Sequence, residues 1–503
     1  MKTNSLDFDA QVLREKILDL AMRGKLVKQD PNDEPASVLL EKIKAEKAEL
    51  VKEGKIKKSK ALPEITDDEK PFDIPDSWEW VRLGDLFTIF NGKAFKPKDW
   101  TEKGIPIVRI QNLNNPLAEY HLYDGPIEER YHLNGNELLF AWSGTPGTSF
   151  GAHIWKDQEA VLNQHIFKLE FNQKELDKGF LKNAMNFRIL KLIDDAHGSA
   201  GLRHITKKMF EETIIPLPPL SEQSRIAAKI AQLFALLRKV ESSNQQYAKL
   251  QTLLKSKVLD LAMRGKLVKQ DPNDEPASVL LEKIKAEKDQ LIKEKKIKKS
   301  KPLPPISDEE KPFEIPDSWG WVRLGDVTNF VGTGMVIPAN KQFDTFTSQM
   351  LPYFKMNNIG NWDGEFGVNN WTYVLKTQNS DNYLLKSGQL LFNTRNSREL
   401  VGKTTIVPDN LNKKILANNN ILRIESFGKM KLKYINYYLI SPFSRHMFLN
   451  MTAATTNVAA IYQKQLNKLL VPLPPLEEQK RIVKKIDQLF ILLKRDKNYK
   501  KVK

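Results

Sequence analysis

The longest regular pattern of hydrophobic positions in the chain runs from Ile226 to Leu261. Apolar residues recur there in alternating steps of four and three, which is the a/d heptad repeat of a supercoiled helix. Asn244 and Gln251 are polar exceptions, and a buried polar residue at such a position can fix helix register. The pattern predicts a continuous helix over about 222–263, roughly 60 Å long, with Ser221 and Glu222 forming its N-terminal cap.

Shorter patterns predict an α+β organisation around this helix. Amphipathic helices are expected near 35–53 and 276–295, each with a proline, Pro35 or Pro276, in its first turn. Apolar and β-branched runs predict strands, and two further stretches predict helices. The strands are expected at 81–90, 105–113, 137–142, 165–171, 351–359, 389–393 and 419–425, and the helices at 178–195 and near 430–450.

An internal repeat organises the whole chain. Thirty residues, LDLAMRGKLVKQDPNDEPASVLLEKIKAEK, occupy Leu18–Lys47 and return unchanged 241 residues later at Leu259–Lys288. A second block, PLPPLSEQSRI, begins at Pro216 and returns as PLPPLEEQKRI 256 residues later. The segments between the blocks have diverged, and the change of offset makes the second 15 residues longer. Near-identical connecting regions suggest a shared docking task, whereas dissimilar inserts suggest that two different things are recognised.

The two offsets meet at one position of the heptad. The second copy of the heptad helix stops at Lys503, the counterpart of Tyr247, and by the other offset Leu6 is also the counterpart of Tyr247. We therefore expect the N-terminal helix to complete the C-terminal one, with both paired antiparallel to the central helix. The alternative is a long helix that simply packs on its neighbouring domain.

Composition narrows the class of partner. The 503 residues carry a formal net charge of +17, which favours a polyanion, with nucleic acid as the first candidate. Cysteine is absent, which excludes disulfides, thiolate zinc sites, iron–sulfur clusters and cysteine nucleophiles and fits a reducing cytosol. The sequence shows neither a signal-peptide pattern nor a bilayer-spanning run, so a cytoplasmic protein is expected.

Motifs that resemble catalytic sites fail on inspection. Gly402-Lys403-Thr404 looks like the end of a phosphate-binding loop, but the required upstream glycine is Ser397. FVGTG at 330–334 resembles a methyl-donor-binding turn, yet its partner motif is missing, and a strand end with a turn is the better interpretation. The seven histidines show no metal-ligand spacing. The sequence therefore indicates a recognition protein.

The repeated segments carry a family resemblance. The paired LxLAMRGKLVxQDPNDEPASxLLEKI segments, the two PLPPLxEQxRI motifs and the two dissimilar inserts closely resemble the DNA-specificity (S) subunit of type I restriction–modification systems, in the subfamily with an N-terminal helical extension. The resemblance covers essentially the whole chain. It implies an α+β fold, with two globular target recognition domains separated by a long antiparallel helical coiled-coil spacer in a circular pseudo-twofold repeat. The implied parts are an N-terminal helical region at 1–53, target recognition domains at 54–213 and 300–470, a central helical spacer at 214–299 and a C-terminal helix at 471–503.

The resemblance also implies function and partners. This chain would be a non-catalytic subunit that binds double-stranded DNA at a bipartite, asymmetric sequence, with the helical rod setting the number of unread base pairs. Its protein partners would be two modification (adenine-N6 methyltransferase) subunits and restriction (translocase/nuclease) subunits, with no membrane partner. S-adenosylmethionine, ATP and Mg²⁺ would belong to those partners, and this chain would hold no cofactor. The alternatives are a stand-alone site-specific repressor and a fused methyltransferase-nuclease.

Both inserts contain side chains that can contact bases. Arginine, asparagine and glutamine offer bidentate donors and acceptors to base edges. In the first insert the candidates are Arg109, Gln111, Asn112, Asn114, Trp142, Ser143, Gln164 and His165, with Arg203 and His204 for positioning. In the second they are Lys355, Asn357, Asn358, Arg395, Asn396, Asn418, Asn419 and Asn420. The alternative for each is a loop-capping or strand-end polar group, and phosphate contacts are expected instead from Lys93, Lys96, Lys98 and Lys341.

Overall fold

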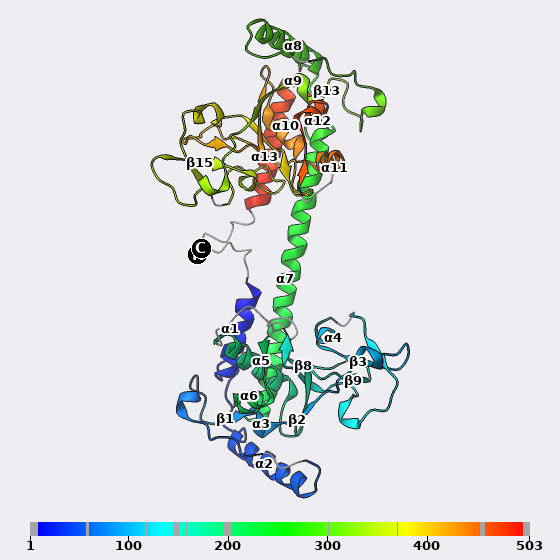
Figure 1. Ribbon diagram of the computed structural model, residues 1–503, viewed down its shortest axis with the longest axis vertical. Coiled ribbons are helices and arrows are strands. Elements are labelled where there is room, and N and C mark those ends of the chain that lie inside the picture. The colour runs from blue at the N-terminus through cyan, green and yellow to red at the C-terminus, as the bar shows by residue number, and fades with distance from the viewer. Residues whose placement is uncertain are drawn as a thin grey trace. The chain divides into compact units, whose positions relative to one another are not determined.

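Two compact units make up the chain. The computed structural model describes residues 9–56, 60–115, 118–144, 150–156, 158–195, 203–299, 301–369, 371–452 and 458–495. The first unit lies within residues 7–244 and the second within 245–503, and Figure 1 labels their elements. Both contain helices and small β-sheets, so the predicted α+β class is confirmed. In the described ranges no helix combines the length and apolar character needed to cross a membrane.

The predicted central helix is α7, one continuous helix over Leu220–Met263 (Figure 1). It begins two residues before the expected position, so Ser221 lies in its first turn and does not cap it. The predicted amphipathic helices are α2 (Ala36–Lys52) and α8 (Ala277–Lys293), with Pro35 and Pro276 one position before the first turn, at the N-caps.

Further helices cover the sheets or link the strands. The longer ones are α1 (Ala10–Met22), α5 (Lys178–Asp195), α10 (Leu432–Leu439), α11 (Pro442–Met451) and α13 (Leu476–Arg495). The helix expected near 430–450 is therefore two, because Ser441 caps a new helix that starts at Pro442. Short helices are α3 (Leu83–Leu86), α4 (Ile110–Asn114), α6 (Lys207–Glu212), α9 (Leu324–Val327) and α12 (Gln463–Asn467). Single 3₁₀ turns occupy Asp67–Glu69, Pro97–Asp99, Glu129–Tyr131, Asp308–Glu310, Ala339–Lys341, Met356–Asn358 and Ser380–Tyr383.

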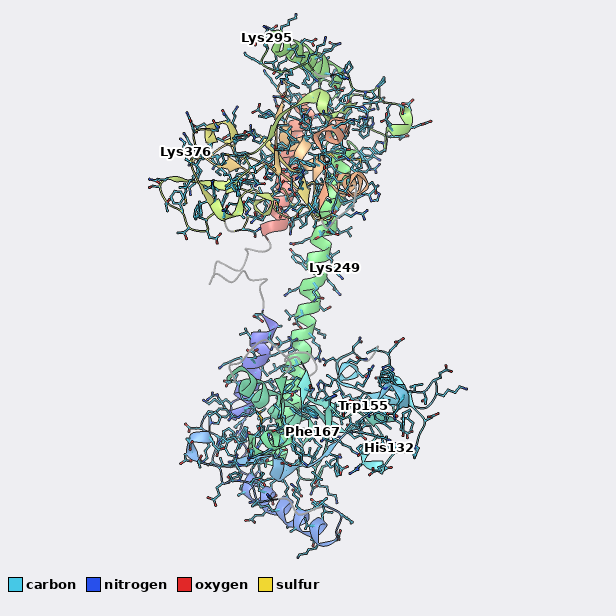
Figure 2. All side chains as sticks on the ribbon, in the orientation of Figure 1. His132, Trp155, Phe167, Lys249, Lys295 and Lys376 are labelled. Carbon is cyan, nitrogen blue, oxygen red and sulfur yellow. The ribbon has the colours of Figure 1, made fainter. Side chains whose placement is uncertain are left out.

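The described part of the first unit has two four-stranded sheets and two strand pairs. One sheet has the order β2-β10-β6-β8, the other β4-β3-β9-β5, and the pairs are β1-β12 and β11-β7. Phe167 lies in the larger core and Trp155 in a smaller cluster (Figure 2). The strands are β1 (Glu79–Arg82), β2 (Thr88–Asn91), β3 (Ile105–Val108), β4 (His121–Tyr123), β5 (His132–Leu133), β6 (Leu138–Ala141), β7 (Ser143–Gly144), β8 (Gly151–Ile154), β9 (Ala160–Leu162), β10 (Ile166–Glu170), β11 (Arg203–His204) and β12 (Ile214–Leu217).

The second unit repeats this plan although its sequence differs. Its sheets have the orders β14-β21-β17-β19 and β16-β15-β20, and its pairs are β13-β23 and β18-β22. The strands are β13 (Gly320–Arg323), β14 (Thr328–Thr333), β15 (Met350–Phe354), β16 (Thr372–Leu375), β17 (Leu390–Asn393), β18 (Arg395–Asn396), β19 (Thr404–Ile406), β20 (Leu416–Ala417), β21 (Ile421–Ser426), β22 (Ala459–Ala460) and β23 (Leu470–Leu473).

Three predicted strands change into a helical turn within their hydrophobic runs. The run at 81–90 is β1, the helical turn α3 and β2, because one turn of helix places Leu83 and Leu86 together in the core. The runs at 105–113 and 351–359 leave the strand after Val108 and Phe354 and continue as helical turns. Hydrophobic content alone does not separate a strand from a buried helical turn.

Antiparallel helix contacts occur within each unit. In the first, Arg14 of α1 forms a bidentate ion pair with Glu241 of α7, with N···O distances of 3.1 and 2.6 Å, while Met22 shares a core with Ile226. In the second, the Gln251 side chain of α7 donates to the Leu493 carbonyl near the carboxyl end of α13 at 2.9 Å. Among the heptad positions, Val240 and Leu254 are exposed, and Leu6 lies outside the described residues.

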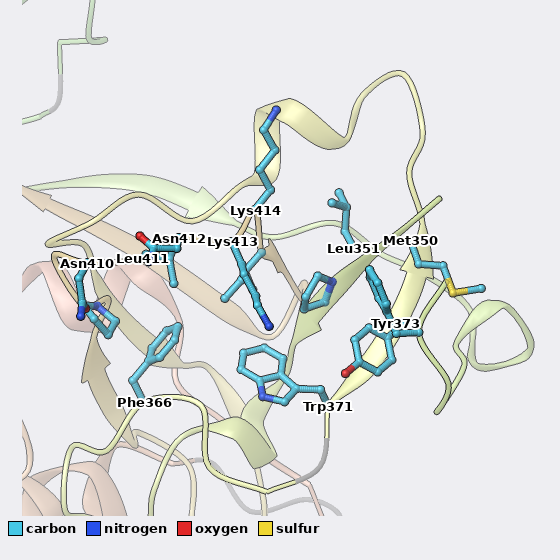
Figure 3. Close-up of a pocket in the computed structure, with 14 residues that line it drawn as sticks. Met350, Leu351, Phe366, Trp371, Tyr373, Asn410, Leu411, Asn412, Lys413 and Lys414 are labelled. Carbon is cyan, nitrogen blue, oxygen red and sulfur yellow. The ribbon is translucent and has the colours of Figure 1, made fainter. Parts of the chain in front are cut away.

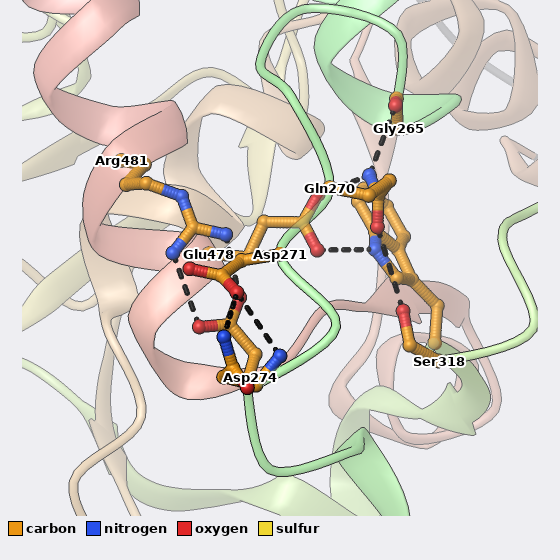
Figure 4. A network of polar contacts seen from close by, with 9 residues as sticks. Gly265, Gln270, Asp271, Asp274, Ser318, Glu478 and Arg481 are labelled. Atoms are coloured by element: carbon orange, nitrogen blue, oxygen red, sulfur yellow. Dashed lines mark hydrogen bonds and ion pairs between the residues drawn. The ribbon is translucent and has the colours of Figure 1, made fainter.

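A buried glutamate joins the helices to the sheets in both units. The Glu222 carboxylate, 1% exposed, accepts from the Trp78 indole at 2.9 Å and from the Gln29 amide at 2.5 Å, and Arg225 pairs with Asp33. The second unit repeats the network through Glu478, Trp319, Gln270, Arg481 and Asp274 (Figure 4). Burial raises the pKa of both glutamates, and hydrogen bonds from the tryptophan and the glutamine oppose that rise. The repeated sequence segments therefore form the same hydrogen-bond network in both units.

We expect Trp78→Phe to destabilise the first unit by about 1–3 kcal/mol at pH 8, because a buried carboxylate loses a donor. The loss also raises the pKa of Glu222 further, so the destabilisation should shrink as pH falls and the carboxyl takes up a proton. Denaturant unfolding at pH 8 and pH 5 measures this. Trp319→Phe should behave alike, whereas Trp155→Phe, whose indole donates to a neutral carbonyl, should show no such pH dependence. Equal destabilisation by Trp78→Phe at both pH values would contradict this account.

Candidate nucleic-acid interface

Two parallel strands bring the predicted residues of the first unit together. Strand β3 pairs in parallel with β9, with Val108 opposite Leu162. Because the carboxyl ends of parallel strands meet at one sheet edge, the segments 109–112 and 163–165 lie side by side. The backbone N–H of Asn163 donates to the Val108 carbonyl at 3.1 Å and holds the two segments together. We call this the carboxyl-end edge of the first unit.

The second unit builds an equivalent edge from different residues. Strand β15 pairs in parallel with β20, with Phe354 opposite Ala417. The segments that follow these strands are 355–358 and 418–420. The backbone N–H of Asn418 donates to the Phe354 carbonyl at 2.9 Å. Lys355 is therefore the equivalent of Arg109. We call the segments 355–358 and 418–420 the carboxyl-end edge of the second unit.

A third segment joins each edge. In the first unit the Trp142 amide donates to the His165 carbonyl at 3.3 Å, and the Trp142 carbonyl accepts from Ile205 at 3.0 Å. Through the pairing of β7 with β11, the backbones of Ser143 and His204 become neighbours. In the second unit Thr394 takes the place of Trp142, donating to the Asn420 carbonyl at 2.8 Å and accepting from Ile461 at 3.0 Å.

Most predicted base-contact residues gather at these edges, although not all face outward. The exposed ones are Gln111, Asn114, Gln164, Asn357 and Arg395, and the half-buried ones are Arg109, Trp142, His165, Lys355, Asn396, Asn419 and Asn420. Ser143 is buried in β7. For Arg203 and His204 only the backbone of β11 is described.

Three predicted asparagines are used by the fold itself. Asn112 and Asn358 are buried, and each accepts from the amide three residues earlier, of Arg109 or Lys355. Asn358 also donates to the Val368 carbonyl at 3.0 Å. Asn418 is buried and donates to the Tyr353 hydroxyl at 2.7 Å. These side chains hold the loops in shape, which is the loop-capping alternative considered for each asparagine.

Among the described residues, no carboxylate pairs with the Arg109 guanidinium. Its guanidinium lies 6.0 Å from the Trp100 ring centroid, and Trp100 stacks on His121 at 3.5 Å with the planes 9° apart. Within the described ranges Arg109 forms no ion pair, and its Nε is buried without a hydrogen-bond partner. Burial lowers the pKa of Arg109, and burial followed by the Arg109 charge lowers the pKa of His121. A guanidinium held on an aromatic ring can donate to a phosphate or to a guanine edge.

Lys355 occupies the same place in the second unit and is held differently. Its Nζ donates to the Gln342 side chain at 2.9 Å. Trp100 and Gln342 are equivalent because each precedes the residue that bridges to the adjacent strand, Thr101 or Phe343. No pattern in the sequence indicates Trp100, His121 or Gln342, since only long-range pairing brings them to the edge.

The predicted phosphate contacts divide into two kinds. Lys96, Lys98 and Lys341 are exposed. Lys93 is half-buried, and its Nζ donates to the Tyr123 hydroxyl at 2.9 Å while lying 4.6 Å from that ring. Lys403, from the segment that resembles a phosphate-binding loop, is buried and donates to the Ile359 carbonyl at 2.8 Å. That lysine supports the fold.

Comparison with known proteins assigns the chain to a family. The model of the type I restriction modification DNA specificity domain matches residues 75–251 and 316–502, more than half of the chain. The chain therefore belongs to this family, whose role is DNA sequence specificity, and the resemblance seen in the sequence is confirmed.

Individual relatives agree with this assignment. The chain is 36% identical to the Type I restriction enzyme EcoAI specificity subunit of Escherichia coli, over 95% of this chain and 88% of that protein. It is 32% identical, with the same coverage, to the Type I restriction enzyme EcoEI specificity subunit of Escherichia coli. A solved chain, from work on complex assembly and conformational transition of the type I R-M system, covers 85% of this chain and 94% of its own length. Its TM-score is 0.56 at 20% identity, which supports the fold alone.

We expect Asn358→Ala to destabilise the second unit by about 1–3 kcal/mol, because the Lys355 amide and the Val368 carbonyl lose a buried partner. Asn357→Ala, one residue away and exposed, should change the free energy of unfolding by less than about 0.5 kcal/mol. Denaturant unfolding of the full chain compares them. Equal effects of the two substitutions would refute the structural role given to Asn358.

Proposed function

We propose that this chain is the non-catalytic DNA-recognition subunit of a type I restriction–modification complex. Each unit contacts one half of a bipartite, asymmetric target in double-stranded DNA through its carboxyl-end edge. The helical regions bind two modification subunits, and restriction subunits join that assembly. In this proposal S-adenosylmethionine, ATP and Mg²⁺ belong to the partner subunits.

The observation that carries the proposal is one backbone arrangement with two sets of side chains. In both edges a cation directly follows β3 or β15. Amide or imidazole side chains lie beside it, in the segments that follow the two parallel strands. The first edge offers Arg109, Gln111, Gln164 and His165, and the second offers Lys355, Asn357, Asn419 and Asn420. Since base identity is read through donor and acceptor patterns, unlike sets select unlike half-sites.

Charge and exposed apolar side chains support the two kinds of partner. The net charge of +17 suits a polyanion. On the helices, large apolar side chains remain in water, which supports docking of protein subunits. Those on α1 are Val12 and Leu13, those on α7 are Leu236, Val240, Leu250, Leu253 and Leu254, and those on α13 are Ile491 and Leu492. Identical repeat segments support two copies of one partner.

We expect Arg109→Ala and Lys355→Ala each to alter one half-site only. Losing a bidentate base contact costs about 1–3 kcal/mol, or roughly 5- to 150-fold in discrimination at one base pair. The assembled complex is tested by sequencing methylated adenines in cells that carry the variant subunit. Lys376→Ala serves as control. Lys376 (Figure 2) is exposed and follows Leu375, which pairs with Met350 at the opposite end of β15 from the edge. Relaxed specificity in both half-sites from one substitution would refute the modular assignment.

We expect a seven-residue helical insertion after Asn244 of α7 to lengthen the spacing between half-sites. Seven residues add about 10 Å and preserve the heptad face, which corresponds to roughly three base pairs at about 3.4 Å each. The same methylation mapping measures the spacing. A seven-residue insertion after Gly54, beyond the end of α2, should leave it unchanged. Unchanged spacing after the α7 insertion would show that this helix does not set it.

A further inference from the structure

The second unit contains an aromatic pocket that the base-contact proposal does not use. Its cavity volume is about 660 Å³, within the range of small-ligand sites. Phe366, Trp371 and Tyr373 line one side, and Lys413 reaches toward the Trp371 indole from the facing segment, whereas Lys414 points away (Figure 3). None of the lining residues is acidic.

Extra chain length in the second insert builds this pocket. Phe343 and Leu351 lie eight positions apart, whereas their equivalents Thr101 and Ile105 lie four positions apart. This longer connection supplies Phe346 and Met350 to the lining.

Two more connections are longer at the same place. The paired residues Tyr353 and Thr372 lie nineteen positions apart, whereas Ile107 and His121 lie fourteen positions apart. This segment supplies Phe366 and Trp371. Ten residues lead from Ile406 to Leu416, where seven lead from Ile154 to Val161, and this segment supplies residues 408 and 410–415. The three connections hold twelve of the fifteen additional residues, so most of the added chain converges on one cavity.

The lining selects for a planar, anionic ligand. Aromatic faces stack on nucleobases, with a gain of about 1–3 kcal/mol per base. Lys413 supplies a cation beside those rings, and Asn410 and Asn412 supply amide donors and acceptors at the rim. With no carboxylate in the lining, an anion meets no opposing charge there. A nucleobase with an attached phosphate combines both features.

We propose that this pocket binds one nucleotide, with its base against Trp371 and its phosphate at Lys413. The pocket draws on the amino-terminal half of β15, at Met350–Pro352, and on the segment before β20. The carboxyl-end edge follows the opposite ends of these two strands, so the two sites are separate. The nucleotide comes either from solution or from an unpaired stretch of a strand, and the proposal does not rest on the proposed function.

Calorimetric titration of the full chain with dAMP, ATP or a short single-stranded oligonucleotide tests the proposal. Saturable binding of dAMP or ATP alone identifies a free nucleotide, and binding of the oligonucleotide alone identifies a strand. Photo-crosslinking with an azido-adenine nucleotide or a bromodeoxyuridine strand should place the adduct within residues 366–373 or 408–415. Absence of binding by all three probes, or an adduct confined to other segments, would overturn the proposal.

Matched variants locate the two parts of the ligand. Trp371→Ala should weaken binding at least tenfold, whereas Trp371→Phe retains a stacking face and should stay within about threefold. Lys413→Ala should weaken dAMP more than deoxyadenosine, since only the former carries a phosphate, and Lys376→Ala should change neither. Circular dichroism checks that each variant folds. Undiminished affinity in both Trp371→Ala and Lys413→Ala would also overturn the assignment.

Discussion

A buried carboxylate near the start of a long helix is the interaction on which the rest of each unit depends. Glu222 holds the turn after α1 through Gln29 and the entry to β1 through Trp78. Glu478 makes the same contacts in the second unit. A carboxylate withdrawn from water is tolerated only while hydrogen bonds replace its hydration. This hydrogen-bond network therefore connects helix, turn and sheet. Gly24 lies in the same turn, with a φ of +66° and no room for a Cβ beside Pro75.

On this shared frame, specificity resides in a few side chains at the ends of parallel strands. The backbone hydrogen bonds that close the two edges are equivalent, residue for residue. The two edges differ in what contacts the cation that follows the strand. Arg109 lies by the Trp100 ring, whereas Lys355 donates to the side-chain oxygen of Gln342. A frame that is indifferent to these side chains permits each edge to diverge without disturbing the other unit, because the core positions beneath are separate.

Differences in length have consequences of another kind. Substitutions at the edge exchange one donor for another, whereas the longer connections of the second unit enclose new space beside β15 and β20. Added residues in surface connections cost little conformational entropy, so such growth is easily accommodated. Its convergence on an aromatic, lysine-bearing cavity distinguishes it from scattered loop extension.

The sequence by itself determined the repeat, the two offsets, the extent of α7 and α5 and the family, because these depend on local periodicity and on identical residues. It also indicated Arg109 and Lys355 as candidate contacts, although it predicted strands that continue past both residues. Only the tertiary structure decided that Asn112, Asn358 and Asn418 turn inward, that Trp100 and His121 stack beside Arg109, and that three separate connections enclose one pocket. The physical reason is that burial and side-chain pairing depend on segments far apart in the chain, which short strands with no local register signal bring together.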